Sequence, residues 1–193
     1  MSEFEIRTSR LRIRSWRDDD FEAYAAMNAD PRVMEFYPSV FSRDESRVSF
    51  ERWRARTAER GYGFWPLEVL GGAAFIGIVG VADPDFEAHF MPAVEIGWRL
   101  MAEHWNRGYA TEAARATLAF GFERLALPEI VSFTTVANVR SRRVMEKIGM
   151  QHSPAEDFLH PLVPDGHPLQ PHVLYRLRRE AIPAHTAPAA RSD

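Results

Sequence analysis

The hydrophobic pattern at the start of the chain predicts one strand followed by two helices. Apolar and basic side chains alternate over residues 11–16, which is typical of a strand with one buried face. Three aspartates at residues 18–20 then provide N-cap chemistry for a helix over residues 21–28, and the Asp-Pro pair at residues 30–31 ends that helix. A second helix is expected over about residues 44–59.

The middle of the chain predicts most of a sheet. Residues 64–70 and 74–81 are apolar runs around a Gly-Gly turn, which indicates an antiparallel hairpin, and residues 93–100 are the next expected strand. A helix is expected over residues 111–125, where apolar side chains recur at near-helical spacing, and a strand over residues 130–136. A strand, a loop, a helix and another strand therefore follow one another.

The last elements complete the sheet. A short helix is predicted over residues 141–148, and Gly149 follows it where a left-handed C-terminal cap belongs. Residues 150–152 and 172–177 are expected to be closing strands around a proline-rich loop. This order favours an α/β fold, in which the two early helices cover one face of a mixed sheet and the two later helices cover the other.

Composition limits the domain organisation and the function. The 193 residues fit one domain, predicted over residues 1–180, and the alanine- and proline-rich residues 181–193 are expected to form a loose tail. A net charge of −3 gives no basic surface for nucleic acid or an anionic membrane. No apolar run approaches the roughly 18 residues of a membrane helix, so a cytoplasmic protein is expected.

Metal and thiol chemistry are not expected. The chain has no cysteine, which excludes disulfides, thiolate metal ligands and a cysteine nucleophile. Four histidines, His152, His160, His167 and His172, lie in the last third of the chain, but they are scattered through a proline-rich loop without tight ligand spacing. We interpret them as surface or substrate-loop residues.

The segment from Trp105 to Thr111 joins a predicted strand to a predicted helix. Such a junction presents unpaired backbone N–H groups and the positive end of the helix dipole, which together form an anion site. Gly108 lets the backbone approach a phosphate, Arg107 adds positive charge, and Thr111 is expected to cap the helix. The lone glycine matches neither the Walker loop nor the dinucleotide fingerprint. On these grounds a diphosphate site and an ordinary strand-helix connection both remain open.

Three motifs favour the diphosphate site over an ordinary strand-helix connection. They are Glu-Ile-Gly-Trp-Arg-Leu at residues 95–100, His-Trp-Asn-Arg-Gly-Tyr-Ala-Thr-Glu-Ala at 104–113, and Asn-Val-Arg-Ser at 138–141 followed by Val-Met-Glu-Lys-Ile-Gly-Met at 144–150. Together they resemble the GNAT superfamily of N-acetyltransferases, in particular its ribosomal-protein-acetylating, RimJ/RimL-like branch. The resemblance extends over residues 8–175. It implies a mixed, largely antiparallel sheet with a splayed strand pair at the acyl-CoA site.

The resemblance also implies acetyl-CoA as co-substrate. Backbone groups of the splayed strand would pair with the pantetheine arm, and the following loop would hold the pyrophosphate. The implied coenzyme contacts are Trp98, Arg99, Leu100, Trp105, Asn106, Arg107, Gly108, Tyr109, Ala110, Thr111, Asn138 and Ser141.

The implied chemistry is direct attack of an amine on the thioester, which needs no enzyme nucleophile. Glu95 is the candidate for removing the amine proton through water, and its alternatives are an outward-facing strand residue or an arginine partner. Ser141 could protonate the departing thiolate or cap the short helix. Tyr175 is a third candidate, against ordinary packing with its hydroxyl at the surface. Met145 stands where many relatives have a tyrosine acid, and methionine cannot donate a proton.

The acceptor side is less defined. The resemblance places the amine between the early helices and the final hairpin, where Glu35, Asp157 and Asp165 could attract it or could be ordinary loop charges. A protein N-terminus, a small amine or an aminoglycoside-like compound all fit, and a homodimer is possible. The alternatives to an enzyme are a coenzyme A-binding regulatory domain without turnover and a structural module with a fortuitous anion site.

Overall fold

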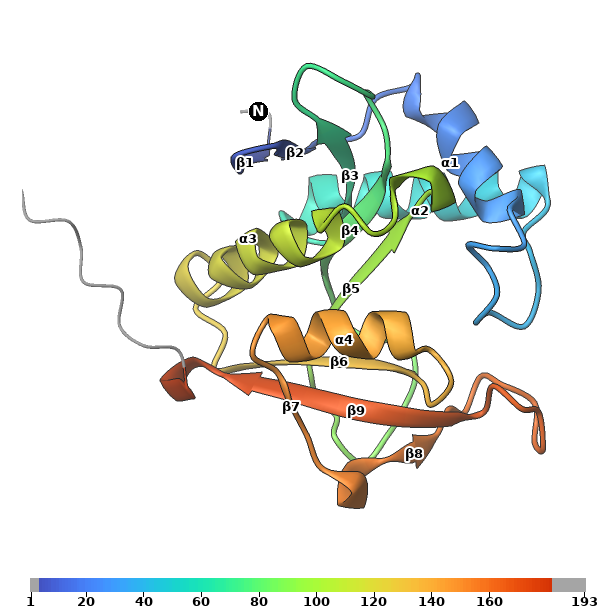
Figure 1. Ribbon diagram of the computed structural model, residues 1–193, viewed down its shortest axis with the longest axis vertical. Helices are drawn as coiled ribbons and strands as arrows, with labels where there is room; N and C mark the ends of the chain where they lie inside the picture. Colours follow the sequence, from blue (N-terminus) through green and yellow to red (C-terminus); the bar gives the residue numbers. More distant parts are fainter. Residues whose placement is uncertain (1–3, 182–193) are drawn as a thin grey trace, which may run out of the picture.

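The computed structural model describes residues 4–181 (Figure 1). Its strands and helices are β1 (Glu5–Arg7), β2 (Leu11–Arg14), α1 (Asp20–Ala29), α2 (Arg43–Arg60), β3 (Phe64–Val69), β4 (Gly77–Ala82), β5 (Glu95–Leu100), α3 (Tyr109–Glu123), β6 (Glu129–Thr135), α4 (Val139–Lys147), β7 (Gln151–His152), β8 (Phe158–Leu159) and β9 (Pro171–Arg178). Short 3-10 turns follow β5, β7 and β9 as η1 (Ala102–His104), η2 (Pro154–Glu156) and η3 (Arg179–Ala181). The predicted tail, apart from its first residue, lies outside the described residues.

The strands form one nine-stranded sheet in the order β1-β2-β3-β4-β5-β6-β9-β7, with β8 paired to β9. Neighbouring strands are antiparallel except β5 and β6, which are parallel and share one residue pair, Glu95 with Val131. The predicted mixed, largely antiparallel sheet is therefore confirmed. Because β4 with β5 and β6 with β9 form full ladders, the sheet consists of two well-paired halves joined at one point.

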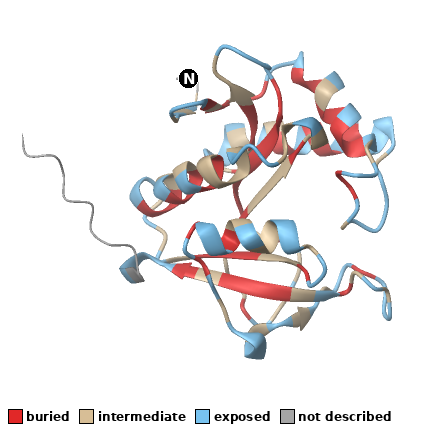
Figure 2. Cartoon of the chain, in the orientation of Figure 1, coloured by how far each residue is buried: buried red, intermediate tan, exposed pale blue. Residues whose placement is uncertain are grey.

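Helices cover both faces of this sheet. On one face, α1 and α2 pack with Phe64 and Ile78, and on the other α3 and α4 pack with Ile96 and Ile130. Buried residues follow the strands and the helix sides that face them (Figure 2). The prediction that the early and the later helices cover opposite faces of the sheet is correct. The junction of β5 and β6 therefore lies between two helix layers.

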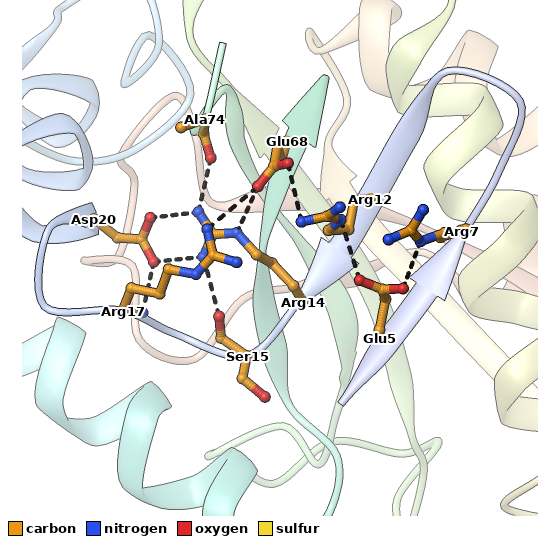
Figure 3. Close-up of polar contacts among 9 residues, drawn as sticks. All are labelled: Glu5, Arg7, Arg12, Arg14, Ser15, Arg17, Asp20, Glu68 and Ala74. Carbon is orange, nitrogen blue, oxygen red and sulfur yellow. Dashed lines mark hydrogen bonds and ion pairs between the residues drawn. The ribbon is translucent and has the colours of Figure 1, made fainter. Parts of the chain in front are cut away.

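Arg14, at the end of β2, is a buried arginine that is 1% exposed. Its Nε donates to Glu68 at 2.9 Å, its Nη1 to Ser15 O at 3.0 Å and Asp20 Oδ2 at 2.8 Å, and its Nη2 to Asp20 Oδ1 and Ala74 O, both at 2.7 Å (Figure 3). Every N–H of the guanidinium thus has an acceptor. This network fixes the start of α1 against the β2–β3–β4 part of the sheet.

Two helix starts differ from the prediction. α3 begins at Tyr109, and its N-cap is Gly108, in the left-handed region at φ 79°, with no side-chain cap, so Thr111 is not the cap. α4 is capped by Asn138, whose side chain accepts from the N–H of Ser141 at 3.1 Å, so the capping role considered for Ser141 was wrong. Gly149 has φ 89°, and its predicted left-handed conformation is confirmed.

Candidate functional site

The edge of β5 that faces β6 loses its strand partner after its first residue. Val94 O still accepts from Val131 N at 2.9 Å, and Ile96 O accepts from the Ser132 hydroxyl at 2.8 Å. Beyond that point β5 and β6 separate, and Figure 1 shows β5 running obliquely away from β6 and α4. The predicted splayed pair is therefore present in the sheet.

The alternation of backbone groups decides which residues of β5 face this gap. Alternate residues of a strand direct their N–H and C=O groups to opposite neighbours. Val94 and Ile96 direct their C=O groups to β6, so Trp98 and Leu100, two and four residues after Ile96, direct their backbone groups to the same side. Arg99 is the one predicted backbone contact of the pantetheine arm that needs correction. It lies opposite Ile78 and directs its backbone groups to β4, so only its side chain is available to a ligand.

The indole of Trp105 closes one end of the gap, since its Nε1–H donates to Leu100 O at 2.9 Å. The N–H and C=O of Trp98 and the N–H of Leu100 then have no strand partner among residues 4–181. Buried backbone groups without a partner are costly, so this edge is suited to a ligand that carries amide groups of its own.

The loop that follows β5 leads into the N-terminus of α3. Asn106 and Gly108 both have positive φ, at 58° and 79°. The first helical bond within α3 runs from Glu112 N to Gly108 O, so the N–H groups of residues 109–111 have no carbonyl partner in the helix. Together with the helix dipole, these groups form the anion site that the sequence pattern allowed.

Glu112 would oppose an anion at this helix start, but its carboxylate is held elsewhere. It accepts from Thr8 Oγ1 at 2.6 Å, from Ser9 Oγ at 3.1 Å, and from Arg10 N at 3.0 Å and Arg10 Nε at 2.7 Å. Burial acts to raise the pKa of the Glu112 carboxyl, but these hydrogen bonds outweigh it, and the pKa is lowered. The β1–β2 loop thus neutralises the acid beside the α3 N-terminus.

A cavity of about 300 Å³ joins the splayed edge to the α3 N-terminus and to α4. All of the predicted coenzyme contacts line this cavity except Arg107. Arg107 is exposed, and its backbone carbonyl accepts from Arg10 Nη1 at 3.0 Å. The α1–α2 loop forms the remaining wall through Phe36 and Tyr37. A larger depression of about 1070 Å³ lies beside α3, between the β1–β2 loop and the end of α4, and it shares Gly108, Thr111 and Lys147 with the first cavity.

Glu95 is the first residue of β5 and lies where the two sheet halves join. The residue is partly exposed, and its carboxylate has no hydrogen-bond or ion-pair partner in the described part of the chain. Burial and the negative charge of Asp85 raise the pKa of the Glu95 carboxyl to about 8, and the positive charge of Arg56 offsets only part of this rise. A carboxyl with such a pKa can exchange a proton near neutral pH.

Ser141 and Tyr175 differ in their relation to the cavity. Ser141 lines it, and no partner is found for its hydroxyl within residues 4–181. Tyr175 is 2% exposed and does not line the cavity; its hydroxyl donates to Glu146 at 3.2 Å and accepts from Arg142 at 3.4 Å. The packing role of Tyr175 is therefore correct, but with a buried side chain rather than a surface hydroxyl.

The acidic residues considered for the acceptor are all engaged. Glu35 pairs with Arg140, Asp157 bonds to His152 Nε2 at 2.8 Å, and Asp165 accepts from Gln170 Nε2 at 2.8 Å. These contacts favour the ordinary-loop interpretation. In the described residues, no group of three or more His, Asp or Glu side chains is arranged to hold a metal ion. No helix of residues 4–181 has the length and apolar character needed to cross a membrane.

Two contacts of the α1–α2 loop were missed by the sequence reasoning. The Arg140 guanidinium pairs with Glu35 and lies 4.6 Å from the centre of the Trp105 ring. The Arg99 guanidinium lies 4.9 Å from the centre of the Tyr37 ring. Both arginines belong to the quoted motifs, but nothing in the periodicity of the loop indicated which residues would meet them.

The comparisons with known proteins agree with this geometry. The family model described as "Acetyltransferase (GNAT) domain" matches residues 10–151. An uncharacterised N-acetyltransferase of Bacillus subtilis (strain 168), YnaD, is 32% identical over 83% of this chain and 89% of its own length. The crystal structure of an acetyltransferase from Agrobacterium tumefaciens str. C58 is 30% identical and superposes with a TM-score of 0.73 over 93% of this chain and 96% of that one.

A further solved structure shares the fold at lower identity. RimJ from Mycobacterium smegmatis, in complex with CoA-disulfide, is 18% identical, with a TM-score of 0.73 over 94% of this chain and 88% of that chain. The resemblance drawn from the sequence motifs is confirmed by the family match and by the fold. The chain belongs to the GNAT acetyltransferases and is an N-acetyltransferase.

Proposed function

We propose that the protein transfers an acetyl group from acetyl-CoA to a primary amine by direct attack, with the coenzyme bound along the cavity between β5, α3 and α4. The observation that carries this proposal is the loss of strand pairing beyond Glu95 and Val131, which leaves backbone groups of Trp98 and Leu100 directed into a gap. A cytoplasmic location belongs to the same proposal, and so does a possible homodimer.

The residues present fit the two chemical parts of the coenzyme. The amides of the pantetheine arm would pair with the open C=O group of Trp98 and the N–H of Leu100. The diphosphate would accept from the N–H groups at the start of α3, where Gly108 keeps the approach free of a side chain. Asn138 lines the cavity and is held in place by its own bonds to Ser141 N and Thr134 Oγ1.

Acetyl-CoA supplies an activated acyl thioester, and the chain would supply proton transfer and charge stabilisation. As the amine nitrogen bonds to the carbonyl carbon, its proton would pass through water to Glu95. The N–H of Trp98 would stabilise the charge on the carbonyl oxygen. When the carbon–sulfur bond breaks, the Ser141 hydroxyl would give a proton to the thiolate and take one back from solvent water. Met145 is 1% exposed within the core and takes no part.

The amine acceptor would enter beside the α1–α2 loop, whose Phe36 and Tyr37 line the cavity. A protein N-terminus or a small-molecule amine both suit this entrance. Because Glu35, Asp157 and Asp165 are already hydrogen-bonded or paired within the chain, these carboxylates are poorly suited to attract a cationic amine.

Release of free thiol from acetyl-CoA by the purified chain, with a panel of amines and N-terminal peptides, tests the proposal. Binding of the coenzyme without release for every amine would refute catalysis. Gly108→Glu is expected to abolish coenzyme binding in calorimetry, since it places a carboxylate where the phosphates would lie. Ala119→Glu is the matched control, because it adds the same charge at an exposed position of α3. Equal binding by Gly108→Glu and Ala119→Glu would exclude this location.

A further inference from the structure

Three residues of β5 lie on the sheet face covered by α1 and α2. Ile96 and Trp98 pack with α3 and α4, so the alternation of side chains places Glu95, Gly97 and Arg99 on the opposite face. Glu95 and Arg99 are four residues apart, which corresponds to about 13 Å along an extended strand. Gly97 contributes no side chain between them. This face therefore carries a carboxyl at one end and a guanidinium at the other.

The guanidinium of Arg99 lacks an anionic partner. Its Nη1 donates to the sulfur of Met34 at 3.2 Å, which is a weak acceptor, and the rings of Tyr37 and Phe41 lie 4.9 and 5.9 Å from its central carbon. Its Nε is buried without any hydrogen-bond partner among the described residues. A buried donor that is left unsatisfied is destabilising, so the arrangement is suited to a ligand that accepts from it.

Two other arginines that line the cavity are already paired with carboxylates, whereas Arg99 is not. Arg32, which lines the same cavity, forms hydrogen bonds with both carboxylate oxygens of Asp30, and Arg140 pairs with Glu35. Met34, Tyr37 and Phe41 of the α1–α2 loop contact Arg99. Glu35, the acidic residue of this segment, pairs with Arg140 instead. No carboxylate of the described chain lies within ion-pair distance of Arg99.

We propose that Arg99 recognises a carboxylate of the amine acceptor, so that the enzyme acetylates amines that also carry an anionic group. The inference rests on the proposed function, since it assigns the acceptor class of the same site. A planar guanidinium pairs with a carboxylate through two parallel hydrogen bonds, and the rings of Tyr37 and Phe41 hold the guanidinium plane in place. The acceptor amine then lies on the Glu95 side of Arg99, beyond the Phe64 ring that packs over Gly97.

Matched acceptor pairs test the assignment. Amino acids and dipeptides are compared with their C-terminal amides in thiol release from acetyl-CoA, using the wild-type chain, Arg99→Gln, Arg99→Lys and Arg32→Gln. The wild-type enzyme is expected to favour the carboxylate member by about 10- to 100-fold in kcat/KM, the range of a charge-assisted bidentate pair. Arg99→Gln loses this preference, Arg99→Lys keeps part of it, and Arg32→Gln retains it because its cation is already paired.

Each outcome separates this inference from the proposed function. Equal use of carboxylates and amides by the wild type, with turnover intact, overturns the role of Arg99 and leaves the acetyl transfer standing. A loss of acetyl-CoA affinity in Arg99→Gln, measured by calorimetry, would instead assign Arg99 to a coenzyme phosphate and overturn the inference. Absence of both coenzyme binding and turnover would refute the proposed function itself.

A direct binding measurement covers the case in which no panel member is a good acceptor. The side-chain Nε–H signal of Arg99 is followed by NMR in the coenzyme A-bound protein during titration with succinate, and succinamide serves as the neutral control. A saturable shift with succinate alone, absent in Arg99→Gln, supports the inference. No shift at tens of millimolar succinate overturns it.

Discussion

Glu95→Gln should make the protein more stable and less active at the same time. The carboxyl lies at the join of the two sheet halves, has no hydrogen-bond or ion-pair partner in the described chain, and has a pKa raised to about 8 by burial and by Asp85, with partial relief from Arg56. Glutamine has nearly the same shape and carries no ionisable group. The substitution therefore removes the cost of charge at this position and leaves the packing in place.

The magnitude follows from proton linkage. The ordinary pKa of this carboxyl is 4.5, so between pH 4.5 and about 8 the unfolded chain loses its proton while the folded chain keeps it. Because the folded-state pKa is raised, stability falls as pH rises through this window. At pH 7 the raised pKa lowers the free energy of unfolding by at most about 3 kcal/mol. Because the Glu95 residue is partly exposed to solvent, the expected gain for Glu95→Gln is about 1–2 kcal/mol. At pH 5 the expected gain is below about 1 kcal/mol.

Urea unfolding at pH 5, 6, 7 and 8 measures this gain, and thiol release measures turnover of the same variants. The wild-type rate is expected to rise with pH up to about 8, and Glu95→Gln to be slower by about 100-fold or more with a flatter profile. Glu51→Gln, at an exposed position of α2, is the matched control and should change neither quantity. A variant no more stable than the wild type at pH 7 and 8, or a gain equal at every pH, would refute the reasoning.

Three further substitutions test other parts of the structure. Arg14→Leu leaves Asp20 and Glu68 without their shared cation and should lower the free energy of unfolding by about 3–5 kcal/mol in urea titrations. Burial and the neighbouring imidazole of His172 lower the pKa of His160 from 6.5 to about 4, so wild-type stability should fall as pH drops from 6.5 toward 4; His160→Phe should flatten that decline in thermal unfolding. Asn138→Ala removes the α4 N-cap and should cost about 1 kcal/mol, whereas an unchanged unfolding midpoint would mean that the cap bond contributes nothing.

The helix starts show where sequence patterns stop being informative. Asn138 and Ser141 are both good capping residues three positions apart, and periodicity does not distinguish them. The choice depends on where the chain leaves β6, and Asn138 is then placed to accept from the N–H of Ser141. In the same way, Thr111 looked like a cap, although the helix already begins after the left-handed turn at Gly108.

Arg14 illustrates a second limit. Alternation of apolar and basic residues predicted the strand correctly, but it gave no reason for a basic side chain to be buried. Burial depends on Asp20, Glu68 and Ala74, which the fold brings to the end of β2 from three other parts of the chain. A local pattern contains no information on such partners, since their meeting is a property of the sheet order.

The splayed edge could be expected only through the family motifs, because the hydrophobic pattern of β5 is that of an ordinary strand. Its position follows from the topology: a single parallel pair joins two antiparallel halves, so the backbone groups beyond Glu95 have no neighbour. On the other face of the same strand, Gly97 leaves room for the Phe64 ring, which would lie 3.0 Å from a Cβ at this position. In the proposed function this strand gives its edge to the coenzyme, and in the proposed acceptor assignment the Arg99 side chain binds the substrate carboxylate. The Arg99 backbone pairs with β4, whereas its guanidinium Nε has no partner among the described residues.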